Sequence, residues 1–314
     1  MPIQLSVIIV SYNSFNILKR CLKSLYEFTS GISFEVIIVD NASSEGDISK
    51  IIVDFSNIRV IKNEYNIGFA AANNKGLNIA EGKYILFLNN DVIFKENTLQ
   101  KILLFLESSN DSRMLIGCRL LNDDGSIQIS IDRFDSIWNT LTTSFFLYTF
   151  FPKSKVFNRY YENFSELKDP KSVHIIKGAF ILSNKKFIDD LGGFDERFFF
   201  YSEEKDLCKR AINFGGKVIF YPNTEVIHLG GATAGEESWF KYKHILISKI
   251  QYFSKHYSFL KSTIIISIFV FGIVIRIPTY IFIGIFNKSF LNKSFLCLKQ
   301  IIYLPKAIML RNGK

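Results

Sequence analysis

The chain has 314 residues, of which 48% are hydrophobic and 21% charged, so it can form a sizeable core and is not disordered by default. Its four cysteines, Cys21, Cys118, Cys208 and Cys297, lie far apart, which disfavours a zinc module and a disulfide framework and favours a reducing compartment. The formal net charge of +9 first suggests nucleic acid. Much of the basic excess, however, follows residue 240 beside very apolar sequence. This pattern suits an anionic membrane better, and we expect no nucleic-acid partner.

The first part of the chain alternates continuous apolar runs with helix-like stretches. The expected strands are Leu5–Ser11, Phe34–Asp40, Ile58–Lys62 and Tyr84–Leu88, and the expected helices are Phe15–Phe28, Asp47–Phe55 and Ala70–Ala80. Buried strands separated by helices predict a parallel sheet covered on both faces. Ligands bind beyond the carboxyl ends of such strands, and Asp40 and Asp91 both stand at such ends. We therefore expect two acidic groups at one rim of the sheet.

The middle of the chain has a different character. Asn122–Gly125 predicts a hairpin turn, and the aromatic-rich residues 134–161 suggest a lid or an acceptor-side insertion. The expected elements beyond it are a strand over Val173–Ser183, a helix over Glu203–Phe214, and short strands over Lys217–Tyr221 and Glu225–His228.

The last part of the chain predicts a basic helix, Trp239–Tyr257, followed by a long uncharged stretch that Arg276 interrupts. About 20 apolar residues are enough to span a membrane. Arg276 and Pro278 lie inside the stretch, however, and a single span would leave the basic last segment outside, against the positive-inside tendency. An interfacial or re-entrant helical hairpin fits better, and a hydrophobic dimerisation helix pair is the alternative. We expect a catalytic domain over residues 1–240 and a membrane-associating helical tail over residues 241–314.

Three polar constellations are candidates for chemistry, and each also has a structural explanation. Asn89-Asn90-Asp91 follows an apolar strand, where Asp91 can bind a divalent metal or simply close a turn. Ser202–Asp206 opens a helix, where Ser202 resembles an N-cap and the acidic residues suit the helix dipole, or one carboxylate acts as a general base. His228, before two glycines, can ligate a metal or be a hydrogen-bonded histidine.

Asn66–Phe69 begins a helix whose backbone N–H groups can lie near phosphate. The sequence has no GxGxxG, GxxxxGK[ST] or GxSxG pattern, so it does not support a dinucleotide fingerprint, a P-loop or a nucleophile elbow.

Taken in order, these pieces resemble the family 2 glycosyltransferases over roughly residues 4–240, and most closely the rhamnosyltransferase-like members that build bacterial surface polysaccharides. The residues that carry the resemblance are Val7–Asn13, Val39–Ser43, Asn66–Phe69 with Asn74 and Gly76, Leu88–Asp91, Lys177–Phe180, Gly192–Glu196, Phe199–Leu207 and Val226–His228. Any one motif is weak, but the ordered set is specific.

The resemblance implies a GT-A fold, an α/β architecture with a Rossmann-like mixed sheet. It also implies a nucleotide-sugar donor such as dTDP-rhamnose or a UDP-hexose, a divalent metal (Mg²⁺ or Mn²⁺), and inversion at the anomeric carbon. Asp40 matches the acid that contacts the donor base, in a pocket lined by Ser11, Tyr12 and Asn13. Asp91 matches the last acid of the DxD metal motif, and His228 matches a histidine that assists at the metal or diphosphate.

The remaining matched positions divide between the donor side, the acceptor side and the catalytic base. The donor side adds Asn41, Asn66, Gly68, Asn74, Asn89 and Asn90; the acceptor side has Lys177, Gly178 and Ala179; and the catalytic acids are Glu204, Glu203 and Asp206. Asn89 replaces the first DxD acid, so metal binding rests on Asp91 and His228. Glu204 stands where the family usually has Asp, which leaves the base open between Glu204 and Glu203.

The absence of a QxxRW pattern favours transfer of single sugars over processive synthesis. A lipid-linked saccharide is the expected acceptor, because the tail would hold the site near a bilayer. Met1–Gln4 runs into an apolar strand without the regions of a signal peptide, so we expect the cytoplasmic face of the bacterial inner membrane.

Two rival functions remain at the level of sequence. A sugar nucleotidyltransferase would carry a Gly-rich, basic loop near the first strand, where this chain has Ser11–Ser14. A non-catalytic, membrane-bound glycan-binding protein gains some support from Asn89.

Overall fold

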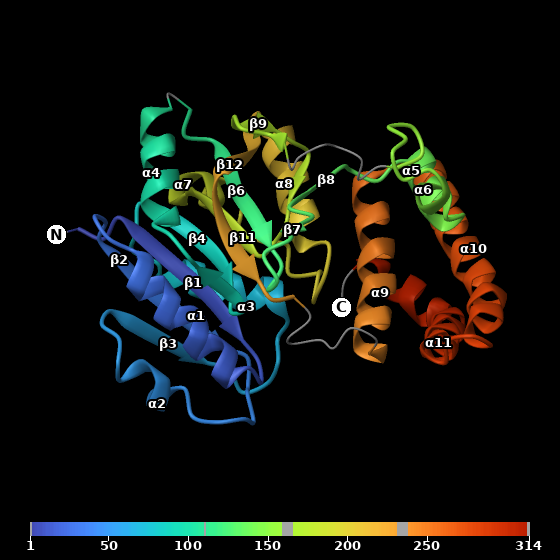
Figure 1. The fold of residues 1–314 in the computed structure, drawn as a ribbon, viewed down its shortest axis with the longest axis horizontal. Coiled ribbons are helices and arrows are strands. Elements are labelled where there is room, and N and C mark those ends of the chain that lie inside the picture. The colour runs from blue at the N-terminus through green and yellow to red at the C-terminus, as the bar shows by residue number, and fades with distance from the viewer. Residues whose placement is uncertain (1, 110, 159–165, 231–237, 313–314) are drawn as a thin grey trace. The chain divides into compact units, whose positions relative to one another are not determined.

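A computed structural model describes residues 2–109, 111–158, 166–230 and 238–312 (Figure 1). The chain forms two compact units. The first comprises Met1–Asp132, Asn163–Glu196 and Glu203–Thr233, and the second comprises Arg133–Glu162, Arg197–Ser202 and Ala234–Lys314. The helical unit thus contains more than the expected tail, because two segments from earlier in the chain belong to it.

The first unit is built on one mixed sheet with the strand order β3-β2-β1-β4-β11-β6-β12-β5. The strands are β1 (Leu5–Ser11), β2 (Phe34–Asp40), β3 (Ile58–Lys62), β4 (Tyr84–Asn89), β5 (Val92–Phe94), β6 (Met114–Leu121), β11 (Phe180–Asn184) and β12 (Lys217–His228). β1, β2, β3 and β4 are parallel to one another, and β12 is parallel to β6. β11 runs antiparallel between β4 and β6, so the carboxyl ends of β4 and β12 lie at the same edge.

Four short strands complete the architecture of this unit. β7 (Ile127–Gln128) pairs with β6, β9 (Lys171–Ser172) pairs with β12, and β8 (Ile131–Asp132) pairs with β10 (Ile175–Ile176) in a separate ribbon. The expected strand Val173–Ser183 is therefore two strands, β10 and β11, which belong to different sheets.

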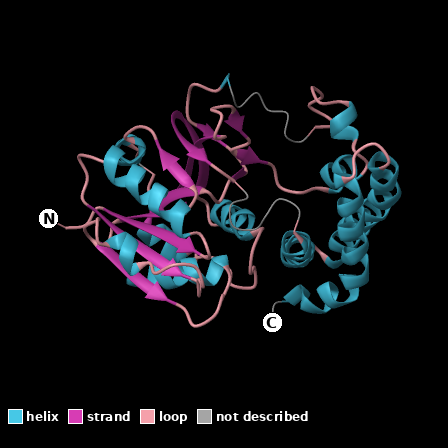
Figure 2. Ribbon diagram, turned by 60° about the horizontal axis from the view of Figure 1, so that its bottom comes forward, coloured by secondary structure: helices cyan, strands magenta, loops and turns pink. Residues whose placement is uncertain are grey.

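The helices of the first unit are α1 (Phe15–Phe28), α2 (Ser49–Ile52), α3 (Phe69–Ile79), α4 (Thr98–Ser108), α7 (Lys185–Asp190) and α8 (Glu203–Asn213). Each longer helix buries an apolar stripe; on α1 this stripe is Leu18, Cys21, Leu22 and Leu25, which join the core formed by one face of the sheet. Figure 2 shows the strands in magenta with helices on their faces. This is the doubly covered sheet that the buried apolar strands predict.

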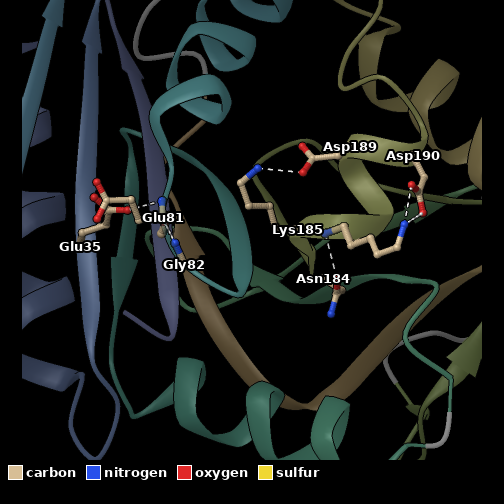
Figure 3. A network of polar contacts seen from close by, with 9 residues as sticks. Glu35, Glu81, Gly82, Asn184, Lys185, Asp189 and Asp190 are labelled. Carbon is tan, nitrogen blue, oxygen red and sulfur yellow. Dashed lines mark hydrogen bonds and ion pairs between the residues drawn. The ribbon is translucent and has the colours of Figure 1, made fainter. Parts of the chain in front are cut away.

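A buried polar network fastens the amino ends of β1 and β2 to the turn before β4 (Figure 3). The Glu35 side chain, 3% exposed, accepts from Ser6 Oγ at 2.6 Å and from the Glu81 backbone N–H at 2.8 Å, and it pairs with Arg59 at 2.6 Å. Gly82 N–H donates to Ser6 Oγ at 2.8 Å. A Cβ on Gly82 would lie 2.5 Å from the backbone nitrogen of Ser6, so glycine is required at this turn.

The second unit consists of helices α5 (Ile137–Ser144), α6 (Leu147–Phe150), α9 (Trp239–His256), α10 (Phe259–Gly284) and α11 (Ser289–Met309), with a short 3-10 helix at Leu310–Asn312. Leu246, Ile247 and Ile250 of α9 are buried with residues of α10 and α11 such as Ile273 and Cys297. Within the described part of the chain, α10 is the one helix long and apolar enough to cross a membrane.

The aromatic-rich segment 134–158 packs on the C-terminal helices; residues 159–161 of the expected insertion lie outside the described residues. Arg276 Nη2 donates to Thr143 O at 2.9 Å, and its guanidinium lies 5.0 Å from the centre of the Phe146 ring. Gly272 lies against Ser144, so close that a Cβ would meet Ser144 Cβ at 2.6 Å. The arginine that interrupts the apolar run is therefore satisfied by α5 and α6.

Candidate functional site

Asp91 and His228 meet because β5 pairs with the end of β12. His228 lies opposite Val92 in that antiparallel pair, and Leu229 N–H donates to Asp91 O at 3.0 Å. His228 Nε2 is 3.3 Å from Asp91 Oδ1 and 3.3 Å from Asn89 Nδ2. Both side chains are largely buried, with 17% of His228 and 7% of Asp91 exposed. The structure thus brings together Asn89, Asp91 and His228; Gly231, also part of the glycine pair after His228, lies outside the described residues.

A divalent cation fits the donor atoms of this corner. Asp91 Oδ1 is buried and has no hydrogen-bond partner among the described residues, which leaves a carboxylate lone pair unsatisfied. Within the described ranges no three His, Cys, Asp or Glu side chains converge as a metal cluster, and Asp91 and His228 are the two side chains of this kind that meet at this corner. Mg²⁺ commonly takes one or two protein ligands and completes its shell with waters and substrate phosphates. The donor set therefore suits a metal that is shared with a diphosphate.

Gln128 is part of this corner and was missed by sequence reasoning. Its Oε1 lies 2.6 Å from His228 Nδ1, on the side of the ring opposite Asp91. The only sequence signal near it is the hairpin turn at Asn122–Gly125, which the structure confirms through the Gly125 N–H bond to Asn122 O at 2.9 Å. That turn directs β7 back along β6 and so delivers Gln128 to the end of β12.

The loops after β1 and β2 are joined at the expected nucleotide pocket. Asp40 Oδ1 accepts from Ser43 N–H at 3.1 Å, and Asn13 N–H donates to Ser43 Oγ at 2.9 Å. Asn13 Oδ1 accepts from Ser44 N–H at 2.8 Å, and Asn41 N–H donates to Ser11 O at 2.8 Å. Ser11, Asn13 and Asp40 are therefore assembled on one rim, with Tyr12 between the first two in the chain.

Asn41 organises the neighbouring turn instead of pointing a spare amide outward. Its Nδ2 donates to Asn66 Oδ1 at 3.0 Å and to Gly68 O at 3.2 Å, and its Oδ1 accepts from Asn63 Nδ2 at 3.0 Å. Gly68 has φ 90° and its N–H donates to Asn66 Oδ1 at 2.9 Å, just before α3 begins. These three expected donor-side residues shape the loop at the start of α3.

Asn74 and Asn90 are likewise engaged within the protein. Asn74 bonds both backbone groups of Phe194, with its Nδ2 donating to Phe194 O at 2.8 Å and its Oδ1 accepting from Phe194 N–H at 2.9 Å. Asn90 Nδ2 donates to Ser14 Oγ at 2.5 Å, which ties the end of β4 to the loop after β1. Asn90 thus links the corner formed by Asp91 and His228 to the loop after β1, and Asn74 anchors the loop before α8.

The residues expected on the acceptor side, Lys177–Ala179, border the Asp91–His228 corner through the β4–β11 pairing. Asn89 N–H donates to Ala179 O at 3.0 Å, and Lys177 N–H donates to Ser130 O at 3.1 Å. A Cβ on Gly178 would lie 3.4 Å from Glu204 Cβ, so α8 begins beside the same turn. The chain segment Lys177–Ala179 therefore runs from the strand that carries Asn89 to the helix that carries Glu204.

The three acids at the start of α8 have different environments. Asp206 is fully buried and accepts from Arg210 Nε at 2.7 Å, the pairing expected from their spacing, and Arg210 also donates to Leu191 O and Gly193 O. Burial raises the pKa of Glu203 well above its usual value, and the neighbouring Glu204 raises it further. Glu203 Oε2 has no hydrogen-bond partner among the described residues. A neutral acid suits Glu203, while Glu204 is only partly buried.

The helix α8 starts without the capping geometry expected of Ser202. Ser202 has φ 69° and Tyr201 has φ 72°, so two successive non-glycine residues adopt the left-handed conformation, whereas an N-cap residue normally has a β-region backbone. Such backbone strain is often found at functional sites.

The family model for glycosyl transferase family 2 matches residues 6–191, more than half of the chain. An N-acetylglucosaminyl-diphospho-decaprenol L-rhamnosyltransferase of Mycobacterium tuberculosis is 25% identical over 74% of this chain and 78% of its own length. An uncharacterized glycosyltransferase of Haemophilus influenzae is 34% identical over 38% of this chain, and the aligned part spans only 41% of that relative.

Solved structures support the fold. A mannosyltransferase from Pyrobaculum calidifontis in complex with GDP-Man and Mn²⁺ matches with a TM-score of 0.56 at 13% identity, covering 99% of this chain and 89% of that one. GalNAc-T7 with UDP, GalNAc and Mn²⁺ matches with a TM-score of 0.57 at 18% identity, covering 79% of this chain and 47% of that one. The mixed α/β sheet is thus a GT-A-like fold, and the chain belongs to glycosyl transferase family 2.

Proposed function

We propose that the chain transfers a single sugar, with inversion, from a nucleoside-diphosphate sugar to a hydroxyl group of a saccharide. The proposal rests on the way these residues lie along one edge of the sheet. The β4–β11 ladder joins the Asp91–His228 pair to the turn Lys177–Ala179, and Glu204 lies beside that turn. Donor binding and proton abstraction can then occur on neighbouring elements. The similarity to the rhamnosyltransferase of Mycobacterium tuberculosis and to structures that hold UDP or GDP-Man with Mn²⁺ supports the proposal.

The mechanism assigns one role to each end of the rim. Asp40 and the loop after β1 bind the nucleoside, and Asp91 with His228 would hold a Mg²⁺ or Mn²⁺ ion. When bound, the ion neutralises charge on the diphosphate leaving group. Glu204 takes the proton from the acceptor hydroxyl, and that oxygen bonds the anomeric carbon from the face opposite the diphosphate. The bond from the anomeric carbon to the diphosphate oxygen breaks, and the nucleoside diphosphate leaves as an anion.

Glu204 is the preferred base over its two neighbours. A general base must be ionised before the reaction, but burial raises the pKa of Glu203 and so disfavours its ionised form, and Asp206 is already paired with Arg210. Glu204 is partly exposed and adjoins the acceptor-side turn.

The test is a transfer assay with UDP-, GDP- and dTDP-sugars, dTDP-rhamnose and UDP-hexoses first, in the presence of Mn²⁺. Wild-type chain should form product with at least one donor, and Glu204→Gln should lower kcat by about 10²–10⁴-fold while nucleotide binding persists. Glu203→Gln is the matched control and should keep turnover. Full activity of Glu204→Gln would remove it from the role of base, and glycan binding without transfer by any donor would favour a non-catalytic glycan-binding protein.

We further propose that the helical unit binds a membrane surface, at the cytoplasmic face of a bacterial inner membrane, and that the acceptor is lipid-linked. Large apolar side chains are exposed on α10 and α11 and at their junction, including Phe271, Phe282, Ile285, Phe286, Phe295, Ile302 and Met309. Lysines alternate with them on α11, a composition that suits anionic lipid. The internal bond of Arg276 to Thr143 O removes one obstacle to such a contact.

Point substitutions test this better than truncation, because deleting α10 and α11 would uncover the buried face of α9. The triple change Phe282→Asp, Ile285→Asp and Phe286→Asp alters side chains that are 66–81% exposed and should abolish flotation with anionic vesicles. Val53→Asp, at an equally exposed apolar residue of the other unit, is the control and should float like wild type. Flotation of the triple variant at the wild-type level would refute the membrane surface.

A further inference from the structure

Gln128 lies outside the motifs that carry the family resemblance, yet its side chain contacts three groups at the Asp91–His228 corner. Its Nε2 donates to His228 O at 3.1 Å and to Asn122 Oδ1 at 2.9 Å. Its Oε1 is 2.6 Å from His228 Nδ1. The amide therefore holds the histidine by its backbone and by its ring at the same time.

The backbone carbonyl of His228 decides which way the Gln128 amide faces. A carbonyl oxygen can only accept a hydrogen bond, so the amide nitrogen must be the atom beside it. The amide oxygen, which also only accepts, is then the atom beside His228 Nδ1. Nδ1 must carry a proton to donate to it. In the neutral ring, the nitrogen that keeps a lone pair is therefore Nε2.

His228 Nε2, which also lies 3.3 Å from Asn89 Nδ2, faces the unsatisfied carboxylate. His228 Nε2 and Asp91 Oδ1 are 3.3 Å apart, and Asp91 Oδ1 has no hydrogen-bond partner among the described residues. Two ligands at right angles about a Mg²⁺-sized ion, each about 2.1 Å away, lie about 3 Å from one another. The pair is thus spaced as neighbouring ligands of one octahedral cation.

We propose that Gln128 is a positioning residue, which holds His228 in its Nδ1–H form so that Nε2 is presented to a divalent cation beside Asp91. The inference rests on the metal-assisted donor binding of the proposed function. A histidine in free solution has no such preference imposed on it, and outer-shell partners of this kind fix both the tautomer and the orientation of a ligating ring.

The competing explanation is that Gln128 only fastens the β6–β7 hairpin to the end of β12. Asn122 separates the two roles. It bonds Gln128 Nε2 and Ser126 Oγ and so helps to hold the hairpin, but it makes no bond to the ring of His228. Asn122→Ala loosens the hairpin and leaves the Oε1–Nδ1 bond and the His228 O anchor in place.

The first measurement is Mn²⁺ binding by electron paramagnetic resonance, on the full chain, with UDP, GDP or dTDP present. Gln128→Met, similar in size but unable to accept the bond, should weaken Mn²⁺ binding by about 10–100-fold. Gln128→Glu, which still accepts from Nδ1 but loses the donor to His228 O, should regain part of that affinity, and Asn122→Ala should leave the affinity unchanged. Circular dichroism spectra should be alike for all variants.

The second measurement is the tautomer itself, read from the ¹⁵N imidazole resonances of histidine-labelled protein without metal. The chain has four histidines, so His228→Ala identifies the signal. Wild type and Gln128→Glu should show a protonated Nδ1, and Gln128→Met should lose this pattern. Unaltered tautomer or Mn²⁺ affinity in Gln128→Met, or an equal loss in Asn122→Ala, would overturn the inference alone. Failure of wild type to bind Mn²⁺ with any of the nucleotides would overturn the metal assignment as well.

Discussion

Replacing Glu203 by Gln should make the free energy of unfolding of the first unit fall less as the pH rises. Glu203 is 6% exposed, and burial raises its pKa well above the usual value, with a further contribution from Glu204. The unfolded chain loses the proton near the ordinary pKa of about 4.3, whereas the folded chain keeps it. Below that pH the two states bind the same number of protons. Above it the free energy of unfolding falls as the pH rises, until the raised pKa of the folded state is reached, and it stays at the lower value beyond.

The size of the effect follows from the single Glu203 proton that the folded chain keeps and the unfolded chain loses. Each pH unit inside this window lowers the free energy of unfolding of wild type by about 1.4 kcal/mol relative to Glu203→Gln. Urea denaturation at pH 5, 6 and 7 should therefore show the variant gaining on wild type by about that amount between pH 5 and 6. Gln resembles the neutral acid in shape, so turnover should persist.

The probe has to be chosen from the structure. The chain has two tryptophans, Trp138 and Trp239, and both belong to the helical unit, so their fluorescence does not report on the unit that holds Glu203. Amide hydrogen exchange of β1 and β4, read by mass spectrometry at each urea concentration, follows the sheet instead. A pH-independent difference between the two proteins would show that Glu203 is ionised in the folded state and would refute the reasoning.

Two other substitutions test the packing around the site. Arg210→Met removes the ion pair between Arg210 and the fully buried Asp206 and should cost about 3–5 kcal/mol in urea denaturation. Asp206→Asn should recover part of this loss in the double variant, and equal stability of the single variant and wild type would show that the ion pair does not stabilise the fold. Gly82→Ala forces a methyl against the Ser6 backbone and should cost about 1–3 kcal/mol, whereas Gly125→Ala, with no atom within 4 Å of the new Cβ, has only its left-handed backbone to oppose it. Equal losses in the two glycine variants would contradict the contact at Gly82.

The parallel half of the sheet was predictable because its strands are continuous apolar runs. β1, β2 and β3 begin and end at the expected residues, and α1 does too. The later strands were harder. The two short strands expected within Lys217–His228 form one strand in the structure. Its register against β6 shifts between Tyr221 and Glu225, where the apolar pattern of the sequence is interrupted. α4 and β6 were not predicted at all.

The motifs of the sequence predicted which residues of the candidate site lie together, but not how deeply each of its acids is buried. Asp91 and His228 were expected to act together, and the β5–β12 pairing brings them within 3.3 Å. The choice between Glu203 and Glu204 needed the environment of each side chain, which adjacent positions in a sequence do not reveal. Gln128 could not be predicted because the backbone carbonyl of His228 orients its amide. Every residue type has a backbone carbonyl, so the sequence carries no signal for this contact.

The bond between Arg276 and Thr143 spans 133 residues of sequence, and this separation has a consequence during synthesis. A ribosome adds about 5–20 residues per second, so α5 and α6 emerge roughly 7–27 s before the arginine and the apolar helix that cover them. During that interval Phe145 and Phe146 lack the α10 rings that they contact in the folded chain, Phe271 and Tyr280. The helical unit therefore completes its folding only after α10 has been synthesised. Until then, chaperones or a nearby bilayer can bind α5 and α6 of the nascent chain.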